Sequence, residues 1–247
     1  MAFPTHPAVA GFDRAAATYE RARPEYPAVI VDWLVAELGV PDGGSVLDVG
    51  AGTGKLTRPL LACGLHVVAV EPMAGMRAEL VSSAPEADVR AAAAELLPVA
   101  DESVDAVVAG QAFHWFANDS ALTEFARVLR PRGRLGLVWN ARDLRQPLQS
   151  ELERLIGEYQ RDEPQHASGD WERTLETTAR FVPVAQRRLP YTQRLSPDGL
   201  VERVLSTSFI AALPGAEQAR LADRVRSLAA GSVELAYTTE AFVYRLA

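Results

Sequence analysis

A glycine-rich turn that follows a short apolar run constrains this chain more than any other part of its sequence. The run Val46–Val49 has the composition of a buried strand, and glycines then occupy every second position from Gly50 to Gly54. Because glycine has no Cβ, it adopts left-handed backbone angles easily and lets the backbone approach a ligand closely. The segment therefore predicts a strand, a tight turn and a helix, with the turn forming a cradle for a small molecule.

Two phosphate-binding turns can be compared with this segment by spacing. A phosphate-binding loop needs a glycine five positions before its Gly-Lys pair and Ser or Thr after the lysine. Here those positions hold Val49 and Leu56. The dinucleotide fingerprint needs a third glycine three residues after the second, and Lys55 occupies that position. The turn fails both patterns in their strict form.

A carboxylate follows the next apolar run. The run that begins at Leu65 ends at Glu71, about 20 residues after the glycine turn. An acid at this point is placed to accept both hydroxyls of a ribose. The two segments together predict a nucleoside site at the ends of two strands.

With Asp48, the glycines and the distal Glu71 together, the chain resembles the class I S-adenosylmethionine-dependent methyltransferases. The first motif of that family reads like Val46–Gly54, and its second is an acid at the end of the second strand. The resemblance implies S-adenosylmethionine as cofactor and S-adenosylhomocysteine as product, with Asp48 ordering the turn and attracting the donor's ammonium. An ordinary strand-to-helix turn, with glycines for tight packing, is the alternative.

An N-terminal segment strengthens the resemblance. The segment Phe12–Pro27 starts as a helix that Pro24 ends. It resembles the N-terminal lid of one methyltransferase subgroup, which includes trans-aconitate-methyltransferase-like proteins. That likeness implies that Tyr19 packs over the methionyl part of the cofactor and that Arg23 pairs with its carboxylate. A core aromatic and a surface charge would explain the same two residues without a ligand.

Two further segments resemble the parts of the family that border the adenosine. Met73 follows the acid and a proline, where a core methionine is equally compatible, and small residues stand just before Glu95. The implied cofactor-binding residues are Tyr19, Arg23, Asp48, Gly50, Ala51, Gly52, Gly54, Glu71, Pro72, Met73, Ala93, Ala94, Glu95 and Gln111.

Gly110–Trp115 runs off the end of the apolar strand Val104–Ala109. In an open parallel sheet, ligands bind beyond the carboxyl ends of the strands where the strand order reverses. This position places Gln111 near the sulfonium or its ribose. It also makes His114 the candidate general base, because its ordinary pKa lies near working pH; a hydrogen bond to the loop backbone is the alternative role. The candidate substrate-binding residues are Trp115, Trp139, Asn140 and Arg142.

Strands and helices alternate five times before residue 140, which predicts a doubly wound α/β sheet. The helix expected from Thr53 to Cys63 contains Pro59, so it should kink or start late. The resemblance adds a Rossmann-like sheet of seven mostly parallel strands, an antiparallel last strand and a helical N-terminal lid. We expect one domain over residues 1–247, comprising a lid (11–40), a cofactor-binding core (45–140), acceptor-side cap elements (141–232) and a final strand (233–246).

Charge and cysteine content exclude several classes of protein. A formal net charge of −7 over 247 residues argues against a nucleic-acid groove. Cys63 is the only cysteine, so the sequence predicts no intrachain disulfide and no cysteine-based zinc site, and no other metal-ligand spacing stands out. Without a leader or a bilayer-length apolar run, we expect a cytoplasmic protein with no membrane partner. The sequence leaves the oligomeric state open.

The leading hypothesis is an enzyme that transfers a methyl group from S-adenosylmethionine to an O, N or C nucleophile of a small-molecule acceptor, such as a small acid or a natural product. Its main contribution would be to align donor and acceptor for in-line displacement. Two alternatives stay open. One is an NAD-dependent oxidoreductase, for which Glu71 is suitable but Lys55 is not. The other is a protein that binds S-adenosylmethionine without transferring its methyl group.

Overall fold

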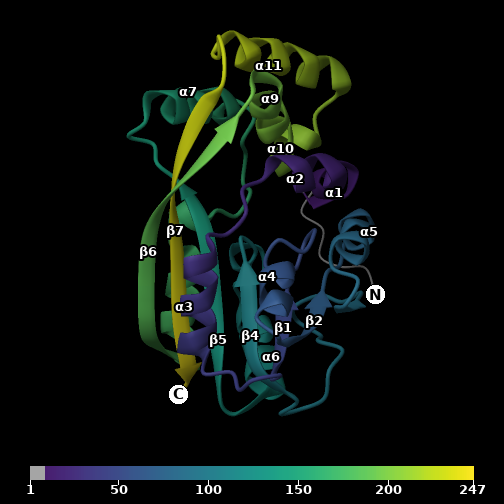
Figure 1. Ribbon diagram of the computed structural model, residues 1–247, viewed down its shortest axis with the longest axis vertical. Helices are drawn as coiled ribbons and strands as arrows, with labels where there is room; N and C mark the ends of the chain where they lie inside the picture. Colours follow the sequence, from purple (N-terminus) through teal and green to yellow (C-terminus); the bar gives the residue numbers. More distant parts are fainter. Residues whose placement is uncertain (1–8) are drawn as a thin grey trace.

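The fold is built on a seven-stranded sheet with the order β3-β2-β1-β4-β5-β7-β6 in the computed structural model, which describes residues 9–247 (Figure 1). The strands are β1 Ser45–Val49, β2 His66–Val70, β3 Asp88–Arg90, β4 Val104–Gly110, β5 Leu129–Arg142, β6 Phe181–Leu195 and β7 Val233–Leu246. The first five strands pair in parallel, and β7 runs antiparallel to both β5 and β6. The predicted fold class, including its antiparallel last strand, is confirmed.

The central strands β1 and β4 are apolar almost throughout because both faces of the sheet are covered by helices. Leu47 and Val107 face one apolar cluster, whereas Val46 and Ala106 face a second cluster on the other side. Because β4 lies next to β1, the strand order reverses between them. A crevice for a ligand is expected at that point.

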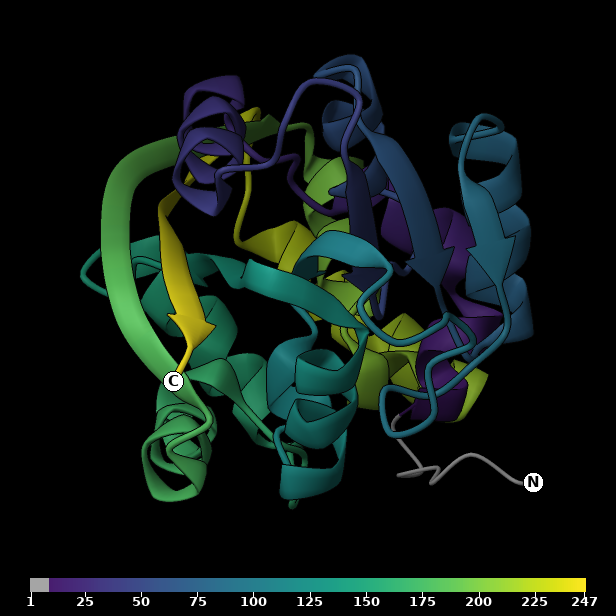
Figure 2. The ribbon, with the colours of Figure 1, turned by 90° about the horizontal axis from the view of Figure 1, so that it is seen from below.

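Helices form a layer on each face of the sheet, as the view from below shows (Figure 2). On one face lie α3 and α4, and on the other lie α6 and α8. The helices are α1 Val9–Arg14, α2 Ala16–Ala22, α3 Ala28–Leu38, α4 Thr57–Ala62, α5 Ala74–Ser83, α6 Asp119–Val128, α7 Pro147–Gly157, α8 Asp170–Thr178, α9 Pro197–Leu205, α10 Ser208–Ala211 and α11 Gly215–Ser227, with short 3-10 helices η1 Phe113–Trp115 and η2 His166–Ser168.

The N-terminal helices α1 and α2 lie between α5 and the pair α9 and α10 (Figure 1). The single helix expected from Phe12 is two helices, which break at Ala15. The Asp13 carboxylate accepts a hydrogen bond from the Gly75 amide and so fixes the break against the start of α5. Within the range 11–40, α1 and α2 contact α5, α9 and α10, whereas α3 packs on the sheet.

A cap stands beyond the carboxyl ends of the parallel strands (Figure 1). Helices α7, α9, α10 and α11 pack around the extended ends of β6 and β7, where Leu235 and Tyr237 join their apolar cluster. The cap and the sheet therefore share two continuous strands.

The helix after the glycine turn starts late, as Pro59 predicts. It begins at Thr57, so the proline falls in the first turn, where its missing amide breaks no hydrogen bond. Leu56 precedes the helix, and no side chain caps it. Gly39 ends α3 in the left-handed conformation.

Candidate active site

A cavity of about 190 Å³ lies at the carboxyl ends of β1, β2 and β4. It is lined by Phe12, Tyr19, Val49, Gly50, Gly52, Glu71, Pro72, Met73, Met76, Ala92, Ala93, Ala94, Glu95, Gly110, Gln111, Ala112, Trp115, Phe116 and Pro164. Ten of the predicted cofactor residues are brought together here from four loops of the sheet and from the N-terminal helices. The cavity occupies the crevice at which the strand order reverses.

The glycine turn forms one wall of this cavity. Gly50 and Gly52 have φ of 68° and 58°, which side-chain-bearing residues rarely adopt. A Cβ on Gly50 would come within 2.8 Å of the Ala112 side chain, whereas a Cβ on Gly52 would meet nothing within 4 Å. Gly54 does not line this cavity. A Cβ on Gly54 would come within 2.8 Å of the Leu80 side chain of α5, so this glycine allows the helix to pack closely.

Glu71 joins the turn to the loop that follows β2. One of its carboxylate oxygens accepts from the Gly52 amide and the other from the Met73 amide, both at 2.9 Å. Burial raises the pKa of this carboxyl, and the two amide donors oppose that shift. The carboxylate is therefore held rigidly in the cavity wall, with one lone pair on each oxygen available to a diol.

A second, smaller cavity of about 30 Å³ adjoins the first and shares Tyr19, Gly50, Gly52, Gly110 and Gln111 with it. The other predicted residues that line it are Arg23, Asp48 and Ala51. Tyr26 and Thr53 also line it, and neither was predicted as a site residue.

Two buried oxygens in this smaller cavity have no hydrogen-bond partner among the described residues, namely Asp48 Oδ1 and Thr53 Oγ1. The other carboxylate oxygen of Asp48 accepts from the Thr57 hydroxyl at 2.7 Å. Burial raises the pKa of Asp48 to about 7. Because buried polar atoms are nearly always paired, these two oxygens indicate a missing hydrogen-bond donor.

Aromatic side chains from distant parts of the chain close the larger cavity. Phe12 packs edge-on against both Tyr19 and Trp115, with ring centroids 5.7 Å apart in each pair. Pro164 adds a contact from the long loop before α8. Phe12 and Pro164 were not predicted as site residues, because no local sequence pattern reports where a lid or a loop lands.

The remaining wall comes from the segment after β3 and the loop after β4. Glu95 accepts from the Asn118 side chain at 2.9 Å, which ties this wall to the start of α6. Gln111 has a φ of 56°, and its amide donates to the Val138 carbonyl at 2.8 Å. This unusual backbone angle for a residue other than glycine is held by the neighbouring strand.

His114 does not line either cavity and faces a separate groove. Its Nδ1 accepts a hydrogen bond from Trp139 Nε1 at 3.2 Å. Burial, together with the nearby His166, lowers the pKa of His114 to about 3. The side chain is therefore neutral at physiological pH and a weak base.

The predicted acceptor residues fall in different places. Trp115 lines the cofactor cavity, but Trp139 is 1% exposed and belongs to the core. Asn140 is buried, where it donates to the Glu25 carbonyl and accepts from Thr239. Arg142 lies two residues further along β5 and pairs with a carboxylate of α7. Only Trp115 is in direct contact with the cavity.

Within residues 9–247, no group of three or more His, Cys, Asp or Glu side chains is arranged to hold a metal ion. The same described part of the chain contains no helix long and apolar enough to span a bilayer.

Residues 47–137 match the family described as "Methyltransferase domain". An uncharacterized methyltransferase of Mycobacterium tuberculosis is 42% identical over 226 residues, which cover 91% of this chain and 88% of that protein. The chain belongs to the class I methyltransferases. This assignment makes it an S-adenosylmethionine-dependent enzyme and disfavours the oxidoreductase alternative.

Solved structures place the methyltransferase fold over nearly the whole chain. A chain from Anaeromyxobacter dehalogenans, assigned as a type II methyltransferase, aligns with a TM-score of 0.66 at 24% identity and covers 90% of this chain and 97% of its own length. Geranyl diphosphate C-methyltransferase from Streptomyces coelicolor, solved with S-adenosyl-L-homocysteine, has a TM-score of 0.53 at 15% identity, with coverages of 89% and 76%. At these identities the likeness concerns the fold alone.

Proposed function

We propose that this methyltransferase binds S-adenosylmethionine in the two adjoining cavities and transfers its methyl group to an O, N or C nucleophile of a small-molecule acceptor. The observation that carries the proposal is a nucleoside-sized crevice with a fixed carboxylate, Glu71, at one end and two unpartnered buried oxygens at the other. The first suits a ribose diol and the second a cationic amino-acid end.

Each part of the donor has matching residues in this arrangement. The small side chains of Ala93 and Ala94 leave room for a flat ring beside Met73. Asp48 would receive the methionyl ammonium, because its free oxygen is buried and unpaired. Arg23, whose guanidinium lies 5.0 Å from the Tyr19 ring centroid, would receive the carboxylate. The bound donor supplies an electrophilic methyl group on a cationic sulfur.

Alignment of donor and acceptor is the main catalytic contribution in this proposal. Well-oriented reacting pairs save about 7–11 kcal/mol of barrier. Gln111 is held at a fixed backbone angle and lines both cavities, so it positions the sulfur end of the donor. The aromatic closure by Phe12, Tyr19 and Trp115 excludes water from the transfer.

A histidine base is not part of this mechanism. His114 points to a separate groove, and its lowered pKa makes it a poor proton acceptor. We propose instead that His114 positions the η1 loop through its hydrogen bond from Trp139. Acceptors whose nucleophile is already ionised need no base.

Calorimetric titration of the whole chain with S-adenosylhomocysteine, S-adenosylmethionine and NAD tests this function. We expect the first two to bind and Glu71→Ala to weaken binding about 10- to 100-fold, since hydrogen bonds to charged groups contribute about 1.5–3 kcal/mol. Glu71→Gln, which keeps the shape, should lose less. Mass analysis of acceptor mixtures should show a gain of one methyl group. Tight NAD binding without a response to the other two ligands would overturn the proposal.

A further inference from the structure

Three arginines from separate elements meet where the cap joins the sheet. Arg23 follows α2, Arg142 ends β5 and Arg203 lies on α9. Arg203 is only 4% exposed, whereas 24% of the Arg142 side chain is exposed. A buried guanidinium without an ion pair among the described residues is unusual, because arginine is almost never fully buried unless paired.

Sheet register and hydrogen bonds hold these side chains together. Arg142 of β5 stands opposite Tyr237 of β7, which stands opposite Tyr191 of β6, so the three residues form one row on the same face of the sheet. Arg203 Nε donates to the Tyr237 hydroxyl at 3.0 Å, and its guanidinium carbon lies 5.8 Å from that ring. Arg142 therefore stands at one end of this row, and Arg203 lies over Tyr237 at its middle.

Arg23 reaches the same place from the lid side. It donates to both the hydroxyl and the carbonyl of Ser206, each at 3.0 Å. The Ser206 hydroxyl in turn donates to the Arg203 carbonyl at 2.8 Å. The next residue, Thr207, is 6% exposed, and its hydroxyl has no partner among the described residues. Polar groups at the junction of α9 and α10 are thus incompletely satisfied.

Positive charge is in excess in this cluster. Glu153 pairs with Arg142, but no described carboxylate forms an ion pair with Arg23 or Arg203. Burial, together with the nearby charge of Arg203, lowers the pKa of Arg23 to about 9. Burial and the same neighbour also lower the pKa of Arg142. The three guanidinium groups repel one another, and a bound anion would relieve that repulsion.

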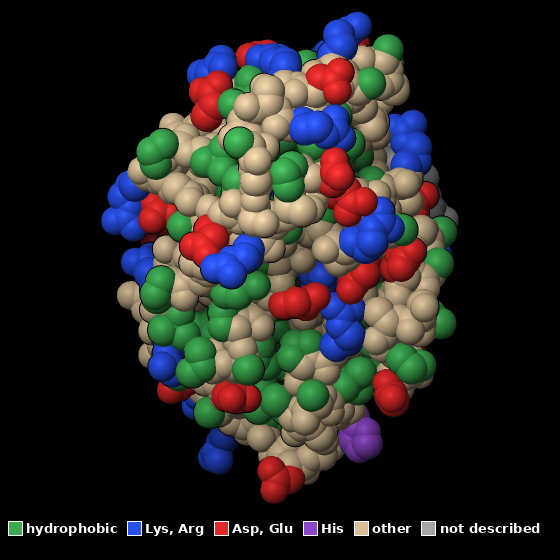
Figure 3. Space-filling view, turned by 45° about the horizontal axis from the view of Figure 1, so that its top comes forward, with side chains coloured by type: hydrophobic (Ala, Val, Ile, Leu, Met, Phe, Trp, Pro, Cys, Tyr) green, Lys and Arg blue, Asp and Glu red, His purple; other side chains and the backbone are tan. Residues whose placement is uncertain are grey.

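The cluster lies beside the proposed donor site. Arg23 lines the smaller cavity together with Gln111. Gln111 Nε2 contacts the Asn140 carbonyl at 3.4 Å, and Arg142 is the second residue after Asn140, on the same face of β5. With the cap turned forward, acidic and basic side chains are mixed around the centre of the visible face (Figure 3). An anion at the cluster would therefore be next to the methionyl end of the donor.

We propose that Arg142 and Arg203, with Tyr237 between them, bind an oxyanion of the methyl acceptor, a carboxylate or a phosphate. This inference rests on the proposed function and names its substrate class as small anionic molecules. Arginine suits the role because its planar fork matches the two oxygens of such groups. The anion fixes the acceptor at one point and leaves its nucleophile to face the donor.

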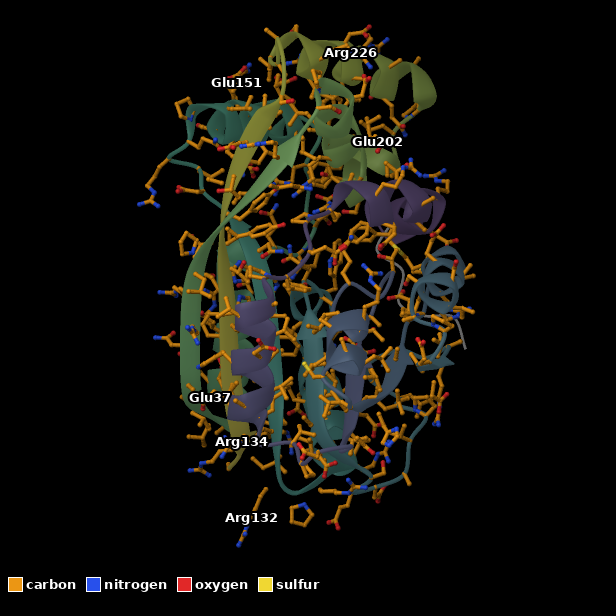
Figure 4. All side chains as sticks on the ribbon, in the orientation of Figure 1. Glu37, Arg132, Arg134, Glu151, Glu202 and Arg226 are labelled. Atoms are coloured by element: carbon orange, nitrogen blue, oxygen red, sulfur yellow. The ribbon has the colours of Figure 1, made fainter. Side chains whose placement is uncertain are left out.

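Calorimetric titration of the protein saturated with S-adenosylhomocysteine tests the inference, with sodium succinate and sodium phosphate as probes at ionic strength matched by NaCl. We expect at least one probe to bind, and its identity separates carboxylate from phosphate recognition. Arg203→Gln and Arg142→Gln should each weaken that binding at least tenfold, and Arg203→Lys should restore part of it. Arg226→Gln is the matched control, because Arg226 pairs with Asp198 on the outside of the cap (Figure 4).

Absence of binding by either probe to the wild type, or equal binding by the Arg203→Gln and Arg142→Gln variants, would overturn the inference. The S-adenosylhomocysteine titration of the wild type reports separately on the proposed function. If Arg203→Gln loses S-adenosylhomocysteine binding because its buried site collapses, the partly exposed Arg142→Gln carries the test.

Discussion

At the scale of single residues, the clearest signal is an unsatisfied carboxylate. Asp48 is completely buried and has one oxygen without a partner, in a cavity that a cationic amino group would complete. Burial raises its pKa from 3.8 to about 7. The folded protein therefore keeps a proton on Asp48 that the unfolded chain loses. The stability from this group is present below pH 3.8 and is lost as the pH rises through about 7.

Donor binding should consequently displace a proton from Asp48. We expect the affinity for S-adenosylhomocysteine to rise up to tenfold per pH unit between about pH 5.5 and pH 7, the limit for one linked proton. Calorimetry in two buffers of different ionisation enthalpy measures the proton released. Asp48→Asn should bind more weakly and lose the pH dependence while remaining at least as stable at neutral pH. An unchanged pH slope in this variant would contradict the role given to Asp48.

At the scale of elements, charge pairs fasten the N-terminal lid to the helix after the glycine turn. Arg58 of α4 contacts Glu20 and Glu25 at 3.0 Å each, and Lys55 contacts Glu25 at 2.7 Å. The two carboxylates belong to α2 and to the segment that follows it. These pairs close the lid that carries Tyr19 over the cavity.

Weakening this connection should loosen donor binding without touching the cavity wall, because Arg58 does not line it. Arg58→Gln should weaken S-adenosylhomocysteine binding by up to about fivefold, as partly exposed ion pairs contribute about 0.2–1 kcal/mol. Titrations at low and high NaCl should show a smaller salt effect in the variant than in the wild type. Arg154→Gln, which removes exposed pairs on α7, serves as control. Identical salt effects in wild type and Arg58→Gln would show that the lid is held by other contacts.

At the scale of the whole molecule, the cap and the sheet are connected by continuous strands rather than by a linker. β6 and β7 pair over residues 181–195 and 233–246, and their ends enter the apolar cluster of the cap helices. Glu202 and Arg226 lie in the cap at the opposite end of the molecule from Glu37 and Arg134 (Figure 4). The long strands tie these two ends together.

The single domain expected from the sequence should therefore unfold in one step. The tryptophans are Trp33, Trp115, Trp139 and Trp171, and all lie outside the cap helices α7, α9, α10 and α11. Their fluorescence reports on the sheet and its flanking helices, whereas far-ultraviolet circular dichroism also reports on the cap. We expect the two urea unfolding curves to coincide. Loss of circular dichroism before the fluorescence changes would mean that the cap unfolds as a separate domain.

The sequence by itself identified most of the residues that line the proposed donor site. The apolar runs, the glycines at Gly50 and Gly52 and the acid Glu71 are local patterns, and each has a local physical cause: backbone freedom, burial or strand alternation. The antiparallel last strand followed from the family resemblance carried by those motifs, whereas the full order of the strands came from the structure. The helices α8, α9 and α10 were not predicted, although α8 and α9 bury apolar side chains at helical spacing, Trp171 with Leu175 and Leu200 with Val204.

Only the tertiary structure decided which side chains share a site. Phe12 and Pro164 are 152 residues apart, and Arg23 meets Arg203 across 180 residues. In the structure Trp139 lies in the core and His114 lies outside the two cavities of the proposed donor site. Both residues had been predicted as site residues because they lie at or beyond the ends of apolar strands. The reason is physical: contacts between distant segments depend on how helices and strands pack, and no spacing within one segment records that packing.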